Sequence, residues 1–246
     1  MYLLGLDLGQ AADYSALAIA RRQEERGVSS YTLPWLERFP LGTSYPAIVA
    51  AVVARVRQLA TQEPATPRVL VVDATGTGRP VVDLLRQARP VARLVAVTIT
   101  GGDAATHDGP QWRVPKRELV STAQVFLQGR RLAIAAALPE AATLTRELLA
   151  FQVKINAETA HDSYGAWREG AHDDLVLAVA LALWAGERPE VRGRPFSAAV
   201  GGERALPDPR GTDDVLFGRA MSGRATTPGD VPIAALRPRH RSPFDY

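Results

Sequence analysis

The segment from Leu175 to Ala185 is apolar on nearly every side, and this feature limits most strongly what the chain can fold into. A helix without a polar face must be buried all round, so the rest of the chain has to surround it. The segment is too short to cross a bilayer, which takes about 20 residues. We therefore expect it to be the central helix of a folded domain.

Short apolar segments elsewhere predict the sheet around this helix. Residues 3–8 and 16–20, joined by a loop with Gly9, predict a β-hairpin, and residues 31–39 predict a third strand with Pro34 at an edge or a bulge. The aliphatic run 69–72 is typical of a strand buried on both faces. Since later strands alternate with helices, the order predicts an α/β domain with a central mixed sheet flanked by helices.

The remaining periodicity completes this outline. It predicts helices at 45–59, 80–87, 116–127 and 139–151, strands at 91–99 and 131–134, a turn at 21–29, a loop at 100–112, and a hairpin of 151–156 with 163–168. The composition changes at Glu187, because the segment beyond it holds eight of the 18 prolines. We expect a folded domain at residues 1–186 and a largely disordered or partner-docking tail at 187–246.

The composition excludes several kinds of protein. Cysteine is absent, so disulfides, thiolate zinc sites and cysteine nucleophiles are excluded. The N-terminus lacks a basic region followed by a long apolar core, so we expect no signal peptide and a cytoplasmic protein. The net charge of +3 argues only weakly for an anionic partner.

Two acidic residues interrupt or end predicted strands. Asp7 lies within the first strand, where burial disfavours an unpaired carboxylate, and Asp73 ends the most apolar strand and precedes Thr-Gly-Thr-Gly. Each has a simpler interpretation: Asp7 as a turn residue that accepts backbone amides before Gly9, and Asp73 as a helix cap or a loop-closing residue. Metal ligation is the alternative for both, and Asp73 also permits a glycine loop against phosphate.

A third acidic point stands at the start of the apolar helix, in the sequence His172-Asp173-Asp174. Helix capping explains one of these acids but not both together with the histidine. A strand acid, a strand-end acid and a helix-start acid form a cluster of oxygen ligands, which suits Mg²⁺ or Mn²⁺ rather than zinc. Two such ions about 4 Å apart would support phosphodiester hydrolysis.

The order of these motifs resembles the nuclease domain of phage terminase large subunits, which has an RNase H-like, resolvase-like fold. The resemblance covers roughly residues 3–186, and its motifs are Gly5-Leu-Asp-Leu-Gly with Asp13-Tyr-Ser, Val72-Asp-Ala-Thr-Gly-Thr-Gly, Val114-Pro-Lys and His172-Asp-Asp-Leu-Val-Leu-Ala. It implies a metal-dependent endonuclease that cuts concatemeric double-stranded DNA during genome packaging.

The resemblance also implies roles for individual residues. Asp7, Asp73 and Asp174 would be the catalytic metal-binding triad, and Asp173 a ligand of a second ion. Two further residues would lie nearby, Asp13 and His172. Mg²⁺ or Mn²⁺, two ions in all, would be the cofactors.

Lys116, flanked by Arg113 and Arg117, is a candidate for contacting DNA phosphates. The simpler interpretation of Lys116 is a solvated residue in the first turn of a helix. The resemblance favours a phosphate contact beside the acids.

One departure from the family concerns the ATPase that drives DNA translocation. A complete terminase large subunit carries an ATPase with a phosphate-binding loop, and neither lysine of this chain lies in such a motif. We therefore expect a separate packaging ATPase, small terminase or portal protein as partner, and the host cytoplasm as location if a phage encodes the chain. Two alternatives remain, an actin- or sugar-kinase-like ATPase and a non-catalytic packaging adaptor on the same fold.

Overall fold

The computed structural model describes residues 1–9, 13–76, 78–150 and 173–192, which belong to one compact unit, Met1–Phe196. Three of the predictions above lie outside the described residues. These are the hairpin of 151–156 with 163–168, the placement of His172, and the nature of the tail from residue 193 onward.

The described residues form one sheet of eight strands in the order β6-β7-β5-β4-β1-β2-β3-β8. The strands are β1 (Tyr2–Asp7), β2 (Ser15–Glu25), β3 (Val28–Phe39), β4 (Arg68–Asp73), β5 (Arg93–Thr100), β6 (Thr106–Asp108), β7 (Gln111–Pro115) and β8 (Leu132–Ile134). The mixed α/β sheet predicted from the sequence is confirmed.

Strand direction determines where the site lies. β1 pairs antiparallel with β2, and β2 with β3, whereas β4 is parallel to β1, β5 to β4, β7 to β5 and β8 to β3. The carboxyl ends of β1, β3, β4, β5 and β7 therefore all lie at one edge of the sheet. In open α/β sheets this is the edge where ligands bind.

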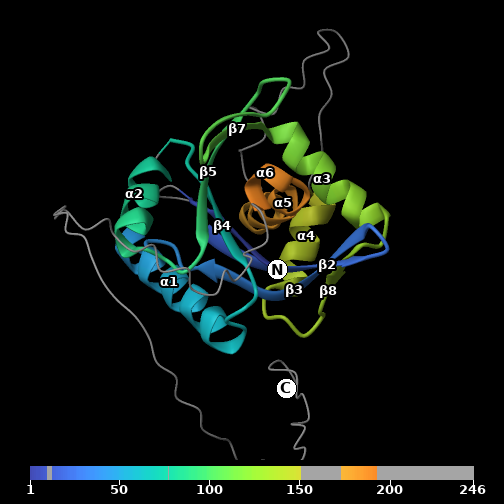
Figure 1. Ribbon diagram of the computed structural model, residues 1–246, viewed down its shortest axis with the longest axis horizontal. Coiled ribbons are helices and arrows are strands. Elements are labelled where there is room, and N and C mark those ends of the chain that lie inside the picture. The colour runs from blue at the N-terminus through green and yellow to red at the C-terminus, as the bar shows by residue number, and fades with distance from the viewer. Residues whose placement is uncertain (10–12, 77, 151–172, 193–246) are drawn as a thin grey trace, which may run out of the picture. The chain divides into compact units, whose positions relative to one another are not determined.

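Helices cover both faces of the sheet (Figure 1). On one face lie α1 (Tyr45–Gln62) and α2 (Gly78–Ala88); on the other lie α3 (Lys116–Gln128), α4 (Ala141–Ala150), α5 (Asp174–Glu187) and α6 (Pro189–Arg192). Each face has its own apolar core. None of the helices in the described part of the chain is both long and apolar enough to span a membrane.

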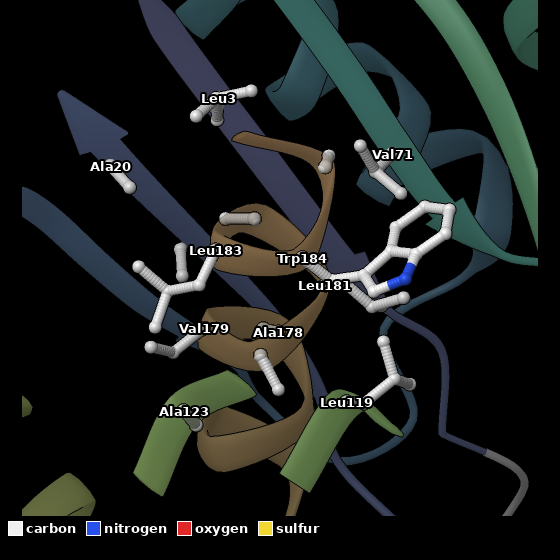
Figure 2. Close-up of a cluster of buried hydrophobic side chains, with 14 of the residues drawn as sticks. Leu3, Ala20, Val71, Leu119, Ala123, Ala178, Val179, Leu181, Leu183 and Trp184 are labelled. Carbon is white, nitrogen blue, oxygen red and sulfur yellow. The ribbon is translucent and has the colours of Figure 1, made fainter. Parts of the chain in front are cut away.

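The helix α5 is the buried central helix that the sequence predicts. Every residue from Asp174 to Gly186 is buried, and Figure 2 shows its side chains among Leu3 of β1, Val71 of β4 and Leu119 of α3. Its one indole nitrogen is satisfied, since Trp184 Nε1 donates to Glu118 Oε1 at 2.7 Å. Uniform burial explains why this segment has no polar face.

The close approach of α5 to the sheet depends on Gly5 of β1. A Cβ added at Gly5 would lie 1.9 Å from the carbonyl oxygen of Ala178 and 3.0 Å from the nitrogen of Ala182. Both neighbours are backbone atoms, which cannot rotate away as a side chain could. The absence of a side chain at this position therefore sets the distance between α5 and β1.

Two expected irregular segments proved to be strands. The expected turn at 21–29 is wrong: β2 runs to Glu25, and a two-residue turn, Arg26 at φ 50° and Gly27 at φ 80°, leads into β3. Both positive φ values fit the tight hairpin turn that matches strand twist. The expected loop at 100–112 is also wrong, because it contains β6 and the start of β7.

The other local predictions agree with the structure. Pro34 lies at a bulge, since the pairing of β2 with β3 shifts between Ile19 and Arg21.

Packing continues beyond the domain boundary expected at Gly186. Glu187 accepts a hydrogen bond from Tyr31 at 2.5 Å, and Val191 of α6 is fully buried.

We predict that Gly5→Ala destabilises the protein by about 3 kcal/mol or more, because the new methyl group would overlap the α5 backbone. Chemical denaturation monitored by circular dichroism measures this change. Gly101→Ala is the matched control, since a Cβ there meets no atom within 4 Å. Equal stability of the two variants would contradict the close approach described above.

Candidate active site

Two acidic residues end adjacent parallel strands on the α5 face of the sheet. β1 and β4 pair with Leu6 opposite Val72, so Asp7 and Asp73 follow side by side. Because side chains alternate between faces, Asp7 lies on the same face as Gly5, which contacts α5. Asp7 is 5 % exposed and Asp73 is 8 % exposed.

The third acid comes from α5 itself. Asp174 is the first residue of the helix and is 5 % exposed. Its Oδ2 lies 3.3 Å from Nη2 of Arg38, which stands near the carboxyl end of β3. The Arg38 guanidinium also lies 3.9 Å from the centre of the Tyr14 ring, an arrangement that restrains the arginine. Asp174 is thus held at the carboxyl edge of the sheet.

The two adjacent acids of α5 have different surroundings. Asp173 occupies the N-cap position but makes no capping hydrogen bond to its helix; its Oδ2 lies 2.9 Å from Nζ of Lys116, the first residue of α3. The amides of Leu175 and Val176 donate instead to Oε2 of Glu147 on α4, at 3.0 and 3.3 Å. The interpretation of Asp173 as the helix cap is therefore wrong, because Glu147 accepts these amides.

The electrostatics connect these acids. Burial, followed by the negative charges of Asp73, Asp174 and Asp173, raises the pKa of Asp7 well above its usual value, and the positive charge of Lys116 acts in the opposite direction. Burial likewise raises the pKa of Glu147 to about 7, against the hydrogen bonds and the Arg38 charge that lower it. A cluster of buried carboxylates is therefore unfavourable in the absence of a cation.

The donor set fits a hard divalent cation. Within the ranges that the structure describes, no three His, Cys, Asp or Glu side chains are already gathered as a metal site. The four aspartates nevertheless provide only carboxylate oxygens, the ligands that Mg²⁺ and Mn²⁺ prefer. Burial and mutual repulsion at Asp7 are relieved by positive charge, which is what such an ion supplies.

The other residues predicted from the sequence lie farther out or elsewhere. Asp13 is exposed and lines a pocket with Ser44 and Tyr45 at the start of α1. Arg113 is exposed on β7, and Arg117 pairs with Asp103 at 2.7 Å. The structure therefore brings Lys116 to the acids but keeps Arg117 occupied on a neighbouring loop.

Sequence reasoning missed Arg38 and Glu147. A signal existed for Glu147, since it follows Ala141 and Leu144 at helical spacing and so falls on the buried side of α4. Arg38 stands two residues after the buried Leu36 and therefore on the same face of the strand. Charged residues at apolar positions are the pattern that had identified Asp7.

We predict that Asp7→Asn raises the melting temperature of the protein in the presence of a chelator, because it removes a buried charge repelled by its neighbours. The folded-state pKa of Asp7 lies above its unfolded value, so its contribution to stability is complete at low pH and is lost as the pH rises through the folded pKa. The advantage of the variant should therefore be larger at pH 8 than at pH 5. Thermal melts at both pH values measure it, with the exposed Asp108→Asn as control.

No protein-family model matches the sequence, and no curated protein is similar to it. Solved structures do match. The inhibitor-bound, manganese-soaked terminase nuclease domain of human cytomegalovirus aligns with a TM-score of 0.50 and 14% identity over 78% of this chain and 85% of that one.

Two further structures align with lower scores. One is the nuclease domain of the large terminase g2p of bacteriophage SPP1, with bound manganese. It aligns with a TM-score of 0.46 and 12% identity over 74% of this chain and 84% of that one. RuvC of Thermus thermophilus aligns with a TM-score of 0.38 and 16% identity over 76% of this chain and 93% of that one. The cytomegalovirus match supports the conclusion about the fold: this chain has the RNase H-like fold of the terminase nuclease domains.

Proposed function

We propose that the protein is a metal-dependent DNA endonuclease of the terminase large subunit type, which cuts concatemeric double-stranded DNA during genome packaging. The observation that carries the proposal is the presence of three buried aspartates, Asp7, Asp73 and Asp174, at the carboxyl edge of an RNase H-like sheet. A buried carboxyl group with a strongly raised pKa, as at Asp7, is typical of catalytic sites. The aligned cytomegalovirus domain is a terminase nuclease and was soaked with manganese.

In this proposal Asp7, Asp73 and Asp174 hold one divalent ion, and Asp173 helps to hold a second. When bound, Mg²⁺ or Mn²⁺ would activate the attacking water and stabilise the charge on the leaving oxygen. The amide of Thr75 donates to Oδ1 of Asp73 at 2.8 Å and so restrains that carboxylate. Arg38 likewise restrains the Asp174 carboxylate, because its Nη2 lies 3.3 Å from Asp174 Oδ2.

Lys116 would change partners during the reaction. It pairs with Asp173, and both side chains are largely buried. With Asp173 holding an ion, the Lys116 ammonium group would turn toward a DNA phosphate at the same edge of the sheet. Arg113 and Arg117 would extend this basic region along the DNA backbone, where such contacts set position rather than sequence preference.

The partners follow from the same proposal. Double-stranded DNA would be the substrate, and a separate packaging ATPase, small terminase or portal protein would bring the nuclease to it. The alternatives, an actin- or sugar-kinase-like ATPase and a non-catalytic adaptor, do not account for the buried aspartate at the start of α5. An assay for ATP hydrolysis distinguishes the first, and metal-dependent cleavage of plain plasmid distinguishes the second.

We predict that supercoiled plasmid is cleaved with Mn²⁺ or Mg²⁺ and not with EDTA, and that Asp7→Ala, Asp73→Ala and Asp174→Ala each reduce the rate at least 100-fold. Each substitution removes a carboxylate that would bind the ion in the transition state. Gel electrophoresis of the plasmid measures nicking and linearisation. Asp108→Ala, an exposed acid on β6, should retain full activity. Full activity in any of the three site variants would remove that residue from the triad.

Asp173 provides a separate prediction about the second ion. Asp173→Ala should raise the Mn²⁺ concentration needed for half-maximal cleavage more than it lowers the rate at saturation, because it removes a ligand of only one ion. Lys116→Met should lower the Mn²⁺ requirement, since the competing ammonium group is gone. Metal titrations of the plasmid assay measure both effects. A Lys116→Met variant that needs more metal than the wild type would contradict the proposed exchange of partners.

A further inference from the structure

The start of α5 is capped in an unusual way. The first amides of a helix have no partner within the helix, and a side chain at the N-cap position normally accepts one of their hydrogen bonds. Asp173 stands at that position in α5, yet it makes no capping bond. The amides of Leu175 and Val176 donate to Glu147, which belongs to a different helix.

This arrangement releases the Asp173 carboxylate from the helix. The amide of Val176 is the one that an N-cap aspartate usually binds, so Glu147 and Asp173 compete for the same donor. Glu147 accepts this amide, and the Asp173 carboxylate accepts a hydrogen bond from Lys116 at 2.9 Å. If Asp173 accepted the Val176 amide, one of its two oxygens would be fixed toward the helix and only the other would be left for an ion.

Glu147 is also linked to the other acid of α5. Its side chain is 6 % exposed, and its second oxygen, Oε1, lies 3.6 Å from Nη2 of Arg38. The same Nη2 atom lies 3.3 Å from Oδ2 of Asp174. Glu147 of α4 therefore supports both aspartates. It accepts the amides that Asp173 would otherwise cap, and it contacts the arginine that pairs with Asp174.

We propose that Glu147 is a positioning residue of the active site, which caps α5 from α4 and so keeps Asp173 available to a metal ion and Asp174 in place. The metal part rests on the proposed function, whereas the capping part does not. The two parts are tested by separate measurements.

The first measurement concerns stability without metal. Glu147→Ala should lower the melting temperature and leave the α5 amides to Asp173. Adding Asp173→Ala should then lower it further, and by more than Asp173→Ala does in the wild-type background. Four thermal melts in the presence of a chelator complete this double-mutant cycle. Additive losses would overturn the competition between the two acids.

The second measurement concerns Mn²⁺ affinity, determined by isothermal titration calorimetry. Residues that orient metal ligands typically change affinity 10–100-fold when removed, so Glu147→Ala should weaken Mn²⁺ binding at least tenfold. Glu147→Gln keeps an oxygen that accepts the two amide bonds and should stay within about threefold of the wild type. Arg146→Ala, the exposed neighbour on α4, is the control and should bind normally.

The outcomes separate the two proposals. Wild-type Mn²⁺ affinity in Glu147→Ala would mean that the residue is only structural and would overturn the positioning role. A wild-type protein that binds no Mn²⁺ would overturn the proposed function and the metal part of this inference, while the stability cycle still decides the cap. Should Glu147→Ala not fold, Glu147→Asp, whose carboxylate is one methylene shorter, takes its place in both measurements.

Discussion

The direct packing of the α5 backbone on Gly5 of β1 is the contact on which the rest of the structure depends. It brings the helix so close to β1 that no side chain fits between them at this position. Since Asp7 follows Gly5 on the same face and Asp174 begins the helix, this distance also governs how the two acids lie relative to each other. A single residue without a side chain thereby connects the packing of the core with the geometry of the site.

The acids themselves oppose folding. Burial and mutual repulsion raise the pKa of Asp7, which means that its charged form destabilises the native state. Apolar cores on both faces of the sheet offset this cost. Arg38 and Lys116 reduce it further, because each places a positive charge beside one aspartate of α5. Under the proposed function, this cost is of the kind commonly found at active sites.

Much of this arrangement was predictable from the sequence. The uniformly apolar α5 and the aliphatic β4 have periodicities that only a buried helix and a buried strand explain, and both predictions are confirmed. The segment 100–112 was not predictable as strands, because β6 has only three residues, all of them exposed, and pairs with β7 in a short hairpin without an apolar pattern of its own. The convergence of acids at one edge followed from strand direction. The roles of Arg38 and Glu147 could not be predicted from the sequence, because they arise from tertiary contacts between elements far apart in the chain.

The position of α5 in the chain has a consequence for how the protein is made. β1 begins at Tyr2, whereas the helix that covers it spans Asp174–Glu187, so the ribosome synthesises the central helix long after the strand on which it packs. Until then this apolar face of the sheet has α3 and α4 but lacks its central helix, and contacts of such large sequence separation form slowly. The acidic residues at the edge of the sheet are equally incomplete during this time. A nascent chain therefore carries only part of the acidic site, and the late arrival of one helix completes the core and the site in the same event.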